Sequence, residues 1–250
     1  MDVLRSPRDV LRARWGKAGD VEQKSADVLD IVTKTDREVE RAARSALAKL
    51  YPDIAFAGEE FGGSRKEDRF WLMDPIDGTV EFSKGEAGCS SMIALLEHGR
   101  VTFAAIYDFL GDEMYWAERG KGAFCNASPI AVSTQDSITG ARIIWELDLS
   151  KSHNETLYKR LRDEGAVLSR WGAAGMEMVK VARGEYDARI SIDPFGMDYD
   201  FAPGSLLVSE AGGIVHNVGA SQYSYTNLDF IASNASLYVS LQRVVLASIR

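Results

Sequence analysis

Apolar positions follow a helical period at the start of the chain. Residues 2–17 are expected to form a helix. Its apolar stripe consists of Val3, Val10, Leu11 and Trp15. A second helix is expected to begin near Asp36 and to end at about Leu50, because Thr35 and Glu38 match a capping box. Its apolar positions are Val39, Ala43, Leu47 and Leu50. The first 50 residues are therefore predicted to be mainly helical.

Short apolar runs separated by turn residues predict a sheet in the rest of the first half. The turn signals at Gly99 and at Gly111 favour hairpins, and hence a largely antiparallel sheet. The expected strands span residues 54–57, 70–73, 91–96, 101–107 and 113–117.

Strand-like and helical patterns alternate in the second half, which predicts helices packed on a sheet. The expected strands are 141–147, 186–192, 213–216 and 230–232. The expected helices are 154–164, 173–182, 201–211 and 237–249, with Pro203 tolerated in a first turn. We expect residues 1–138 and 139–250 to form two halves of one compact unit, with the seam near residues 137–140.

Composition and charge exclude several classes of protein. The 250 residues are 46% hydrophobic and 26% charged, which is typical of a globular chain. The net charge of -8 argues against a nucleic-acid partner bound through phosphate neutralisation. We expect no membrane attachment, because no apolar run approaches the length of a membrane span and no signal peptide is evident. Two distant cysteines, Cys89 and Cys125, indicate a reduced cytoplasmic protein.

The segment Trp71–Thr79 carries the most distinctive chemistry. An apolar run leads into Asp74 and Asp77, and Pro75 between them bends the chain. Both carboxylates can then enter one small volume, where they repel each other unless a cation lies between them. Oxygen ligands of this kind suit Mg2+. The following Gly78 and Thr79 can open a helix whose free N–H groups accept a phosphate.

Three further acids lie at ends of predicted elements. Glu59 follows an apolar strand, Asp36 lies at a strand-to-helix junction, and Asp200 opens a helix. Taken singly, Asp36 and Asp200 are explained as helix caps, Glu59 as part of a solvated loop, and the Asp74–Asp77 segment as a tight turn. Their conjunction favours an all-oxygen Mg2+ site, because ligands gather at such ends in α/β folds. Three histidines at unrelated spacings argue against zinc.

Four motifs in order resemble the inositol monophosphatase superfamily of Mg2+-dependent, lithium-sensitive phosphomonoesterases. They are Gly58–Glu60, Trp71–Phe82, Gly120–Asn126, and Tyr199–Gly204 continuing to Glu210–Gly213. The resemblance covers about residues 24–234. It implies an α/β (α+β) fold, a layered α-β-α-β-α sandwich of the inositol monophosphatase and fructose-1,6-bisphosphatase type, and a homodimer.

The resemblance also implies roles for individual residues. The metal ligands would be Glu59, Asp74, Asp77, Asp200 and the main-chain carbonyl of Ile76. Two or three Mg2+ ions would bind there, Mn2+ could substitute, and Li+ would inhibit. Thr79, paired with Asp36, would orient the attacking water, and Glu59 joins this catalytic set. The phosphate would lie on the amides of Gly78 and Thr79.

The rest of the substrate would contact residues further along the chain. Gly172, Ala173 and Ala174 resemble the segment that lines the pocket, and Lys24 a basic residue at its mouth. The resemblance implies that Asp77 and Asp200 would border the substrate as well. Inositol-preferring members place an acid seven residues before the last metal ligand, and Asp193 occupies that position here.

The activity expected is Mg2+-dependent hydrolysis of a small phosphate monoester, with inositol monophosphate as the first substrate. Two alternatives involve the same reaction on another substrate. One is adenosine 3',5'-bisphosphate, because Val80–Phe82 resembles the branch of the family that acts on it, and the other is histidinol phosphate. One departure from the family pattern is Tyr199, which stands where a Trp is usual. A third alternative is a binding or regulatory protein that uses the fold without turnover.

Overall fold

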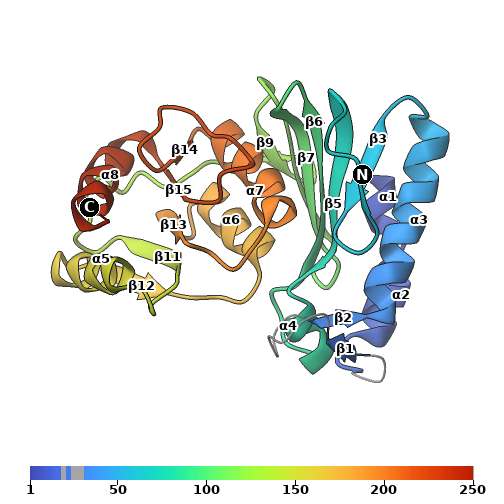
Figure 1. Cartoon of the computed structure of the whole chain (residues 1–250), viewed down its shortest axis with the longest axis horizontal. Helices are drawn as coiled ribbons and strands as arrows, with labels where there is room; N and C mark the ends of the chain where they lie inside the picture. Colours follow the sequence, from blue (N-terminus) through green and yellow to red (C-terminus); the bar gives the residue numbers. More distant parts are fainter. Residues whose placement is uncertain (18–20, 24–30, 250) are drawn as a thin grey trace.

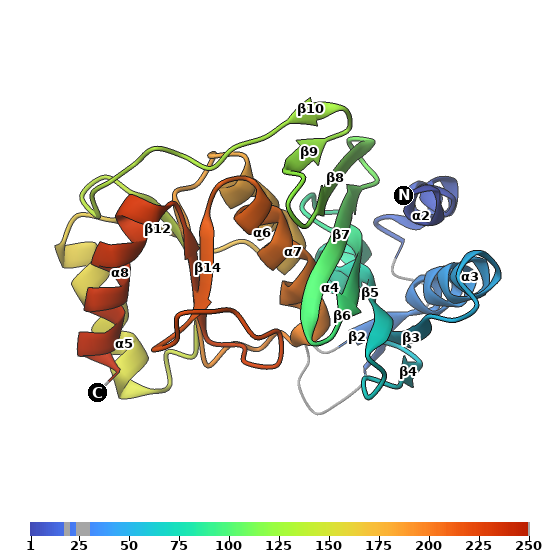
Figure 2. The ribbon, with the colours of Figure 1, turned by 90° about the horizontal axis from the view of Figure 1, so that it is seen from above.

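A computed structural model of the chain describes residues 1–17, 21–23 and 31–249. Lys24, expected at the mouth of the site, lies outside the described residues. Figures 1 and 2 show layers of helices and sheets that alternate along the longest axis. The layered α-β-α-β-α fold expected from the motifs is confirmed. Within the described part, no helix combines the length and apolarity that a membrane span requires.

The N-terminal layer consists of α1 (Asp2–Arg5), α2 (Arg8–Arg14) and α3 (Lys34–Leu50). The single helix predicted over residues 2–17 is wrong, because the chain breaks at Ser6 and Pro7. The capping box of α3 was also misplaced. Thr33, in an extended conformation, is the N-cap, and the Asp36 side chain accepts its backbone N–H. Thr35 already lies inside the helix.

The first sheet has eight strands in the order β10-β9-β8-β7-β6-β5-β3-β4. Only the β3–β5 pair is parallel, so the antiparallel prediction holds for the rest of this sheet. The strands are β3 (Ala55–Gly58), β4 (Gly62–Gly63), β5 (Arg69–Asp77), β6 (Ser90–Glu97), β7 (Arg100–Asp108), β8 (Glu113–Glu118), β9 (Ala123–Cys125) and β10 (Ser128–Pro129). A separate antiparallel pair consists of β1 (Val21–Gln23) and β2 (Ile31–Thr33).

The second sheet has five strands in the order β12-β11-β13-β15-β14. They are β11 (Arg142–Leu147), β12 (Val167–Ser169), β13 (Ala188–Ile192), β14 (Ile214–Asn217) and β15 (Phe230–Ser233). Four of the five match predicted strands. The short edge strand β12 was not predicted, because three residues paired on one side carry no readable period.

Two helices fill the space between the sheets, and two cover the far side of the second sheet (Figure 1). The central pair is α6 (Ala174–Ala182) and α7 (Asp198–Glu210), and the outer pair is α5 (Ser152–Asp163) and α8 (Ala235–Ser248). The short α4 (Thr79–Lys84) follows β5. Helix α7 begins earlier than predicted, so Pro203 is its sixth residue and not in the first turn. The N-termini of α6 and α7 converge on the end of β5, as the side-chain contacts below show.

Candidate active site

A bulge in β5 brings Asp74 and Asp77 to the same side of the sheet. Residues three apart on a regular strand point to opposite faces. Here Asp74 pairs with Met92 and Asp77 with Ser90, so β5 has one residue more than β6 between these pairs. The extra residue reverses the alternation. Pro75 is tolerated at this point because a bulge needs no ladder donor from it.

Asp200 joins these two acids from the opposite layer. It lies in the first turn of α7, where its Oδ2 accepts the Met197 N–H at 2.5 Å. Ligand atoms of Asp74, Asp77 and Asp200 all lie within 4.8 Å of one another. The predicted metal ligands from two distant parts of the sequence thus meet in one volume.

The three carboxylates form a strongly unfavourable charge cluster. Burial raises the pKa of Asp74, and the negative charges of Glu59, Asp200 and Asp77 raise it further. Burial and Asp200 likewise raise the pKa of Asp77. For Asp200 burial raises the pKa to about 7, with Glu59 adding to the effect. Glu59 therefore acts electrostatically on the same volume, as expected of a fourth acidic ligand.

Asp77 is held by the N-terminus of α6. Its two carboxylate oxygens accept the N–H groups of Ala174 at 2.9 Å and of Gly175 at 2.8 Å. The Ser90 hydroxyl, 3.1 Å from Oδ2, adds a third donor. A side chain at Gly175 would place its Cβ 2.8 Å from the same oxygen, so glycine is required for this approach. The segment predicted to line the pocket thus also orients a candidate metal ligand.

Thr79 and Asp36 are paired as the resemblance implied. The Thr79 hydroxyl lies 3.3 Å from Asp36 Oδ1 and 3.0 Å from the carbonyl oxygen of Ile76. Asp36 is fully buried, and its other oxygen accepts the backbone N–H and the hydroxyl of Thr33. Burial raises the pKa of Asp36 to about 7, although the Thr33 hydrogen bonds oppose the shift. Asp36 is therefore both a helix cap and the partner of Thr79.

Close packing joins the loop after β5 to the predicted pocket segment. Gly78 has a left-handed backbone with φ of 83°, and a Cβ there would lie 2.8 Å from the Ala173 Cβ. A Cβ at Gly172 would lie 1.8 Å from a carboxylate oxygen of Glu81. Gly172 and Ala173 therefore lie directly against the start of α4.

Asp193, predicted to contact substrate hydroxyls, is hydrogen-bonded to side chains of another element. It follows β13 with a left-handed backbone, and its carboxylate lies 2.5 Å from Lys151 Nζ, 2.8 Å from His153 Nε2 and 3.1 Å from Asn154 Nδ2. The hydrogen bond from Lys151 lowers the pKa of Asp193. Its carboxylate is thus engaged by residues at the start of α5.

Glu40 is a residue of the site that the sequence analysis missed. Its buried carboxylate accepts the backbone N–H groups of Glu60 at 2.7 Å and Phe61 at 3.1 Å. These amides directly follow Glu59, so Glu40 positions the loop of that candidate ligand. A Cβ at Gly58 would lie 2.3 Å from the Glu40 carboxyl carbon. The sequence signal that could have revealed Glu40 is its position as an acid on the apolar face of the helix predicted up to Leu50.

The residues present fit a bound divalent cation. Asp74 Oδ1 is buried and has no hydrogen-bond partner among the described residues. Buried carboxylate oxygens without donors are costly unless an ion is coordinated. The donor set consists of carboxylate oxygens, which is the ligand chemistry of Mg2+. The cluster therefore has the properties of a metal site of the kind found in metal-assisted hydrolases.

Comparison with known proteins identifies the family. The model of the inositol monophosphatase family matches residues 4–249. The fructose-1,6-bisphosphatase/inositol-1-monophosphatase of Thermotoga maritima is 32% identical over 97% of this chain and 93% of its own length. The Nus factor SuhB of Pseudomonas aeruginosa is 34% identical over 86% of this chain and 82% of its own.

Solved structures agree with this assignment. An IMPase from Thermotoga maritima superposes with a TM-score of 0.89 at 29% identity, covering 99% of this chain and 95% of that one. The extragenic suppressor protein SuhB from Bartonella henselae superposes equally well at 25% identity, covering 98% and 95%. The chain belongs to the inositol monophosphatase family and is thus a member of a family of phosphatases.

Proposed function

We propose that this protein hydrolyses a small-molecule phosphate monoester with the help of Mg2+ bound by Asp74, Asp77, Asp200, Glu59 and the carbonyl of Ile76. The observation that carries the proposal is the convergence of three carboxylates, two of them buried and one partly buried, whose ligand atoms lie within 4.8 Å of one another. One oxygen of the buried Asp74 has no donor among the described residues. Bound cations would neutralise the phosphate dianion and lower the pKa of a water molecule.

The chain's own residues provide the positioning. The N–H groups of Ala174 and Gly175 fix the orientation of Asp77. Asp36 accepts from, or donates to, the Thr79 hydroxyl according to its protonation state, and Thr79 then orients the attacking water. In this proposal the amides of Gly78 and Thr79 receive the phosphate, as the family resemblance implies. Two or three ions, replacement by Mn2+ and inhibition by Li+ belong to the same proposal.

Inositol monophosphate is the first substrate to test, because the motifs and the family model point to it. A specific observation favours a second candidate. The carboxylate of Asp193 is already hydrogen-bonded to Lys151, His153 and Asn154, which disfavours its use for the hydroxyls of inositol.

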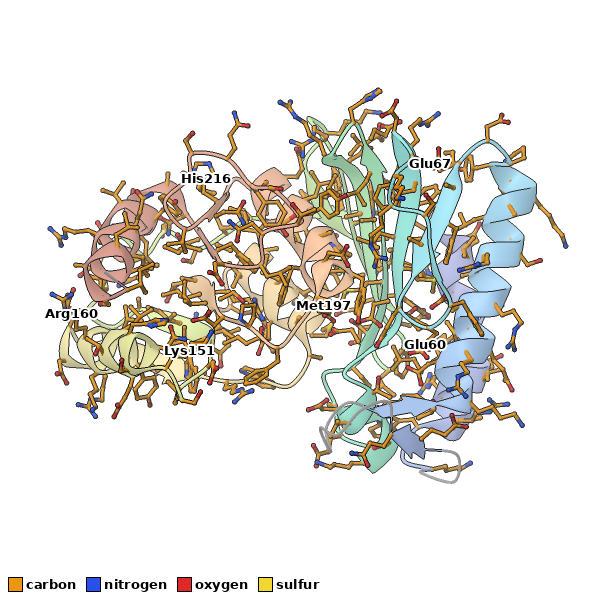
Figure 3. The ribbon with its side chains drawn as sticks, viewed as in Figure 1. Glu60, Glu67, Lys151, Arg160, Met197 and His216 are labelled. Carbon is orange, nitrogen blue, oxygen red and sulfur yellow. The ribbon has the colours of Figure 1, made fainter. Side chains whose placement is uncertain are left out.

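Exposed apolar side chains also favour the second candidate. Trp171, Phe195 and Met197 are 45%, 63% and 51% exposed, and they lie on the two segments that reach Asp77 and Asp200. Figure 3 shows Met197 on the side of its half that faces Glu60. Such a rim favours an alcohol with a flat, weakly polar ring, as in adenosine 3',5'-bisphosphate or histidinol phosphate.

The test is phosphate release from inositol 1-phosphate, adenosine 3',5'-bisphosphate, histidinol phosphate and fructose 1,6-bisphosphate, with Mg2+ and with EDTA. Asp77→Asn should lower kcat at least about a hundredfold, since it removes one candidate ligand and one acceptor for the α6 amides. Asp163→Asn, an exposed acid on α5, is the matched control and should retain full activity.

Two results would count against the proposal. Turnover that persists in EDTA, or in Asp77→Asn, would contradict the metal mechanism. A folded protein that releases phosphate from none of the four compounds, but binds one of them, would favour the binding or regulatory alternative.

The remaining expectations are proposals as well. We infer a homodimer from the family resemblance, to be checked by sedimentation. A reduced, cytoplasmic setting is supported by two free thiols, Cys89 and Cys125. The division into halves at residues 137–140 is supported by the start of the second sheet at Arg142.

A further inference from the structure

Arg189 is a buried charged residue in the middle of the second sheet. It lies on β13, which is paired with β11 and β15, and it is only 1% exposed. Its guanidinium carbon lies 4.8 Å from the ring centroid of Phe201 and 5.4 Å from that of Phe230. A charge at such a position needs compensating partners. The two acidic partners of Arg189 connect it to two segments of the chain that lie next to the acidic cluster.

One partner is Glu177 on α6, which is also buried. Arg189 Nε donates to Glu177 Oε2 at 2.8 Å, and the other oxygen of Glu177 accepts the backbone N–H of Trp171 at 3.0 Å. Trp171 begins the segment that ends at Ala174, whose N–H binds Asp77. This side of the network therefore reaches one candidate metal ligand.

The other partner is Glu146, at the end of β11. Arg189 Nη2 donates to Glu146 Oε2 at 2.6 Å. The other oxygen of Glu146 accepts the N–H groups of Phe195 at 2.9 Å and Gly196 at 3.1 Å. The next residue, Met197, donates its N–H to Asp200. This side of the network reaches a second candidate ligand from the opposite direction.

We propose that Arg189 is a positioning residue that, through Glu177 and Glu146, sets the relative placement of segments 171–174 and 195–197, and hence the width of the substrate pocket. The inference rests on the proposed function, because it assigns the pocket to these segments. Arginine suits the role, since its planar guanidinium directs several donors to different acceptors at once. Nη1 makes a further hydrogen bond to the Ser191 hydroxyl at 3.1 Å. A lysine ammonium keeps the charge but cannot reproduce this fork.

Arg189→Lys is the main variant, because the retained charge still compensates the buried carboxylate of Glu177 and the partly buried carboxylate of Glu146. We expect KM for the best substrate of the panel to rise about tenfold, with kcat changed less than about threefold, because loose pocket segments weaken ground-state and transition-state binding alike. Amide hydrogen exchange should accelerate at Trp171, Phe195 and Gly196 together.

Glu146→Gln tests the Glu146 side of the network separately from the Glu177 side. It is also the variant to use if Arg189→Lys does not fold. It should accelerate exchange at Phe195 and Gly196 and leave Trp171 protected, since Glu177 is untouched. Arg183→Lys is the matched control. Arg183 lies at the opposite end of α6, where it bonds to the Tyr115 hydroxyl and Glu113. It should change neither KM nor the exchange of these amides.

A lower melting temperature with unchanged KM and unchanged protection of all three amides would overturn the proposal, because Arg189 would then serve stability alone. Hydrogen exchange is measured without substrate. If the wild-type protein hydrolyses none of the panel, the proposed function fails, while the exchange pattern still decides the positioning role.

Discussion

At the scale of single residues, buried carboxylates are the features that most need explanation. Glu40 is fully buried on α3, and burial raises its pKa although the Glu60 and Phe61 amides and Arg44 oppose the shift. Each of these groups stabilises the ionised form, so the cost of burying Glu40 is offset by local donors. Because Glu40 accepts two amides of the loop that follows Glu59, we expect it to position that candidate ligand.

Replacing Glu40 by Ala tests that interpretation. The variant leaves the Glu60 and Phe61 amides without their acceptor, so the free energy of unfolding should fall by about 3 kcal/mol, a magnitude typical of lost hydrogen bonds to a charged group. Mg2+ affinity, measured by calorimetry, should also weaken because the loop of Glu59 loosens.

Glu38→Ala on the same helix is the control for Glu40. Glu38 forms a half-exposed pair with Arg14, so its loss should change stability by less than about 1 kcal/mol. Equal Mg2+ affinity in the two variants would show that Glu40 does not position the loop.

At the scale of elements, a β-bulge and the N-termini of three helices position the residues of the candidate site. The bulge in β5 turns Asp77 to the face of Asp74, and the first turns of α3, α6 and α7 supply Asp36, two N–H donors and Asp200. Each of these groups is thus attached to a strand or to the first turn of a helix, whose regular backbone fixes its position. The same logic applies to Asn234, the N-cap of α8, whose side chain also reaches the connection between the two sheets.

Asn234 caps α8 and tethers the connection before β11. Its Oδ1 accepts the Leu237 N–H at 3.0 Å, and its Nδ2 donates to the carbonyls of Ser133 and Gln135. Asn234→Ala should therefore lower the free energy of unfolding by about 2 kcal/mol, and Asn234→Ser, which keeps a cap, by about 1 kcal/mol. Urea titration measures both. Equal losses in the two variants would mean that the cap contributes nothing.

At the scale of the whole molecule, the acidic cluster opposes folding in the absence of a cation. The carboxylates of Asp74, Asp77 and Asp200 come from the two layers on either side of the site, so their repulsion pushes these layers apart. Burial strengthens the repulsion, because the effective dielectric constant is lower than in water. A bound divalent cation would make the net electrostatic interaction across the site attractive and so hold the two layers together.

Mg2+ should therefore stabilise the fold. At about 100 times its Kd, the gain expected from mass action is about 2.7 kcal/mol, visible as a higher melting temperature. Na+ at the same ionic strength should have a much smaller effect. Asp74→Asn should melt higher than the wild type without Mg2+, because it removes a buried charge, and should lose most of the Mg2+ response. A wild-type melting temperature that is insensitive to Mg2+ would contradict the proposed site.

Much of this architecture could be predicted from the sequence. Apolar periodicity located most of the longer helices and strands, because each has one face in a core. The four motifs indicated the layered fold and the family, and Asp36 was correctly paired with Thr79. The prediction of helix boundaries was wrong at two places, where a proline and a capping residue act over a few neighbouring residues. Pro7 divided the first helix, and Thr33 in place of Thr35 capped the third.

The sequence by itself determined most of the longer elements, the acidic residue types and the family, since these depend on local pattern and motif order. Only the tertiary structure decided which groups meet: the bulge that aligns Asp74 with Asp77, the engagement of Asp193 by α5, and the bridge from Arg189 to two distant segments. These contacts join residues remote in the chain, and burial alone gives them their electrostatic strength. No local pattern carries that information, because it arises when the layers pack.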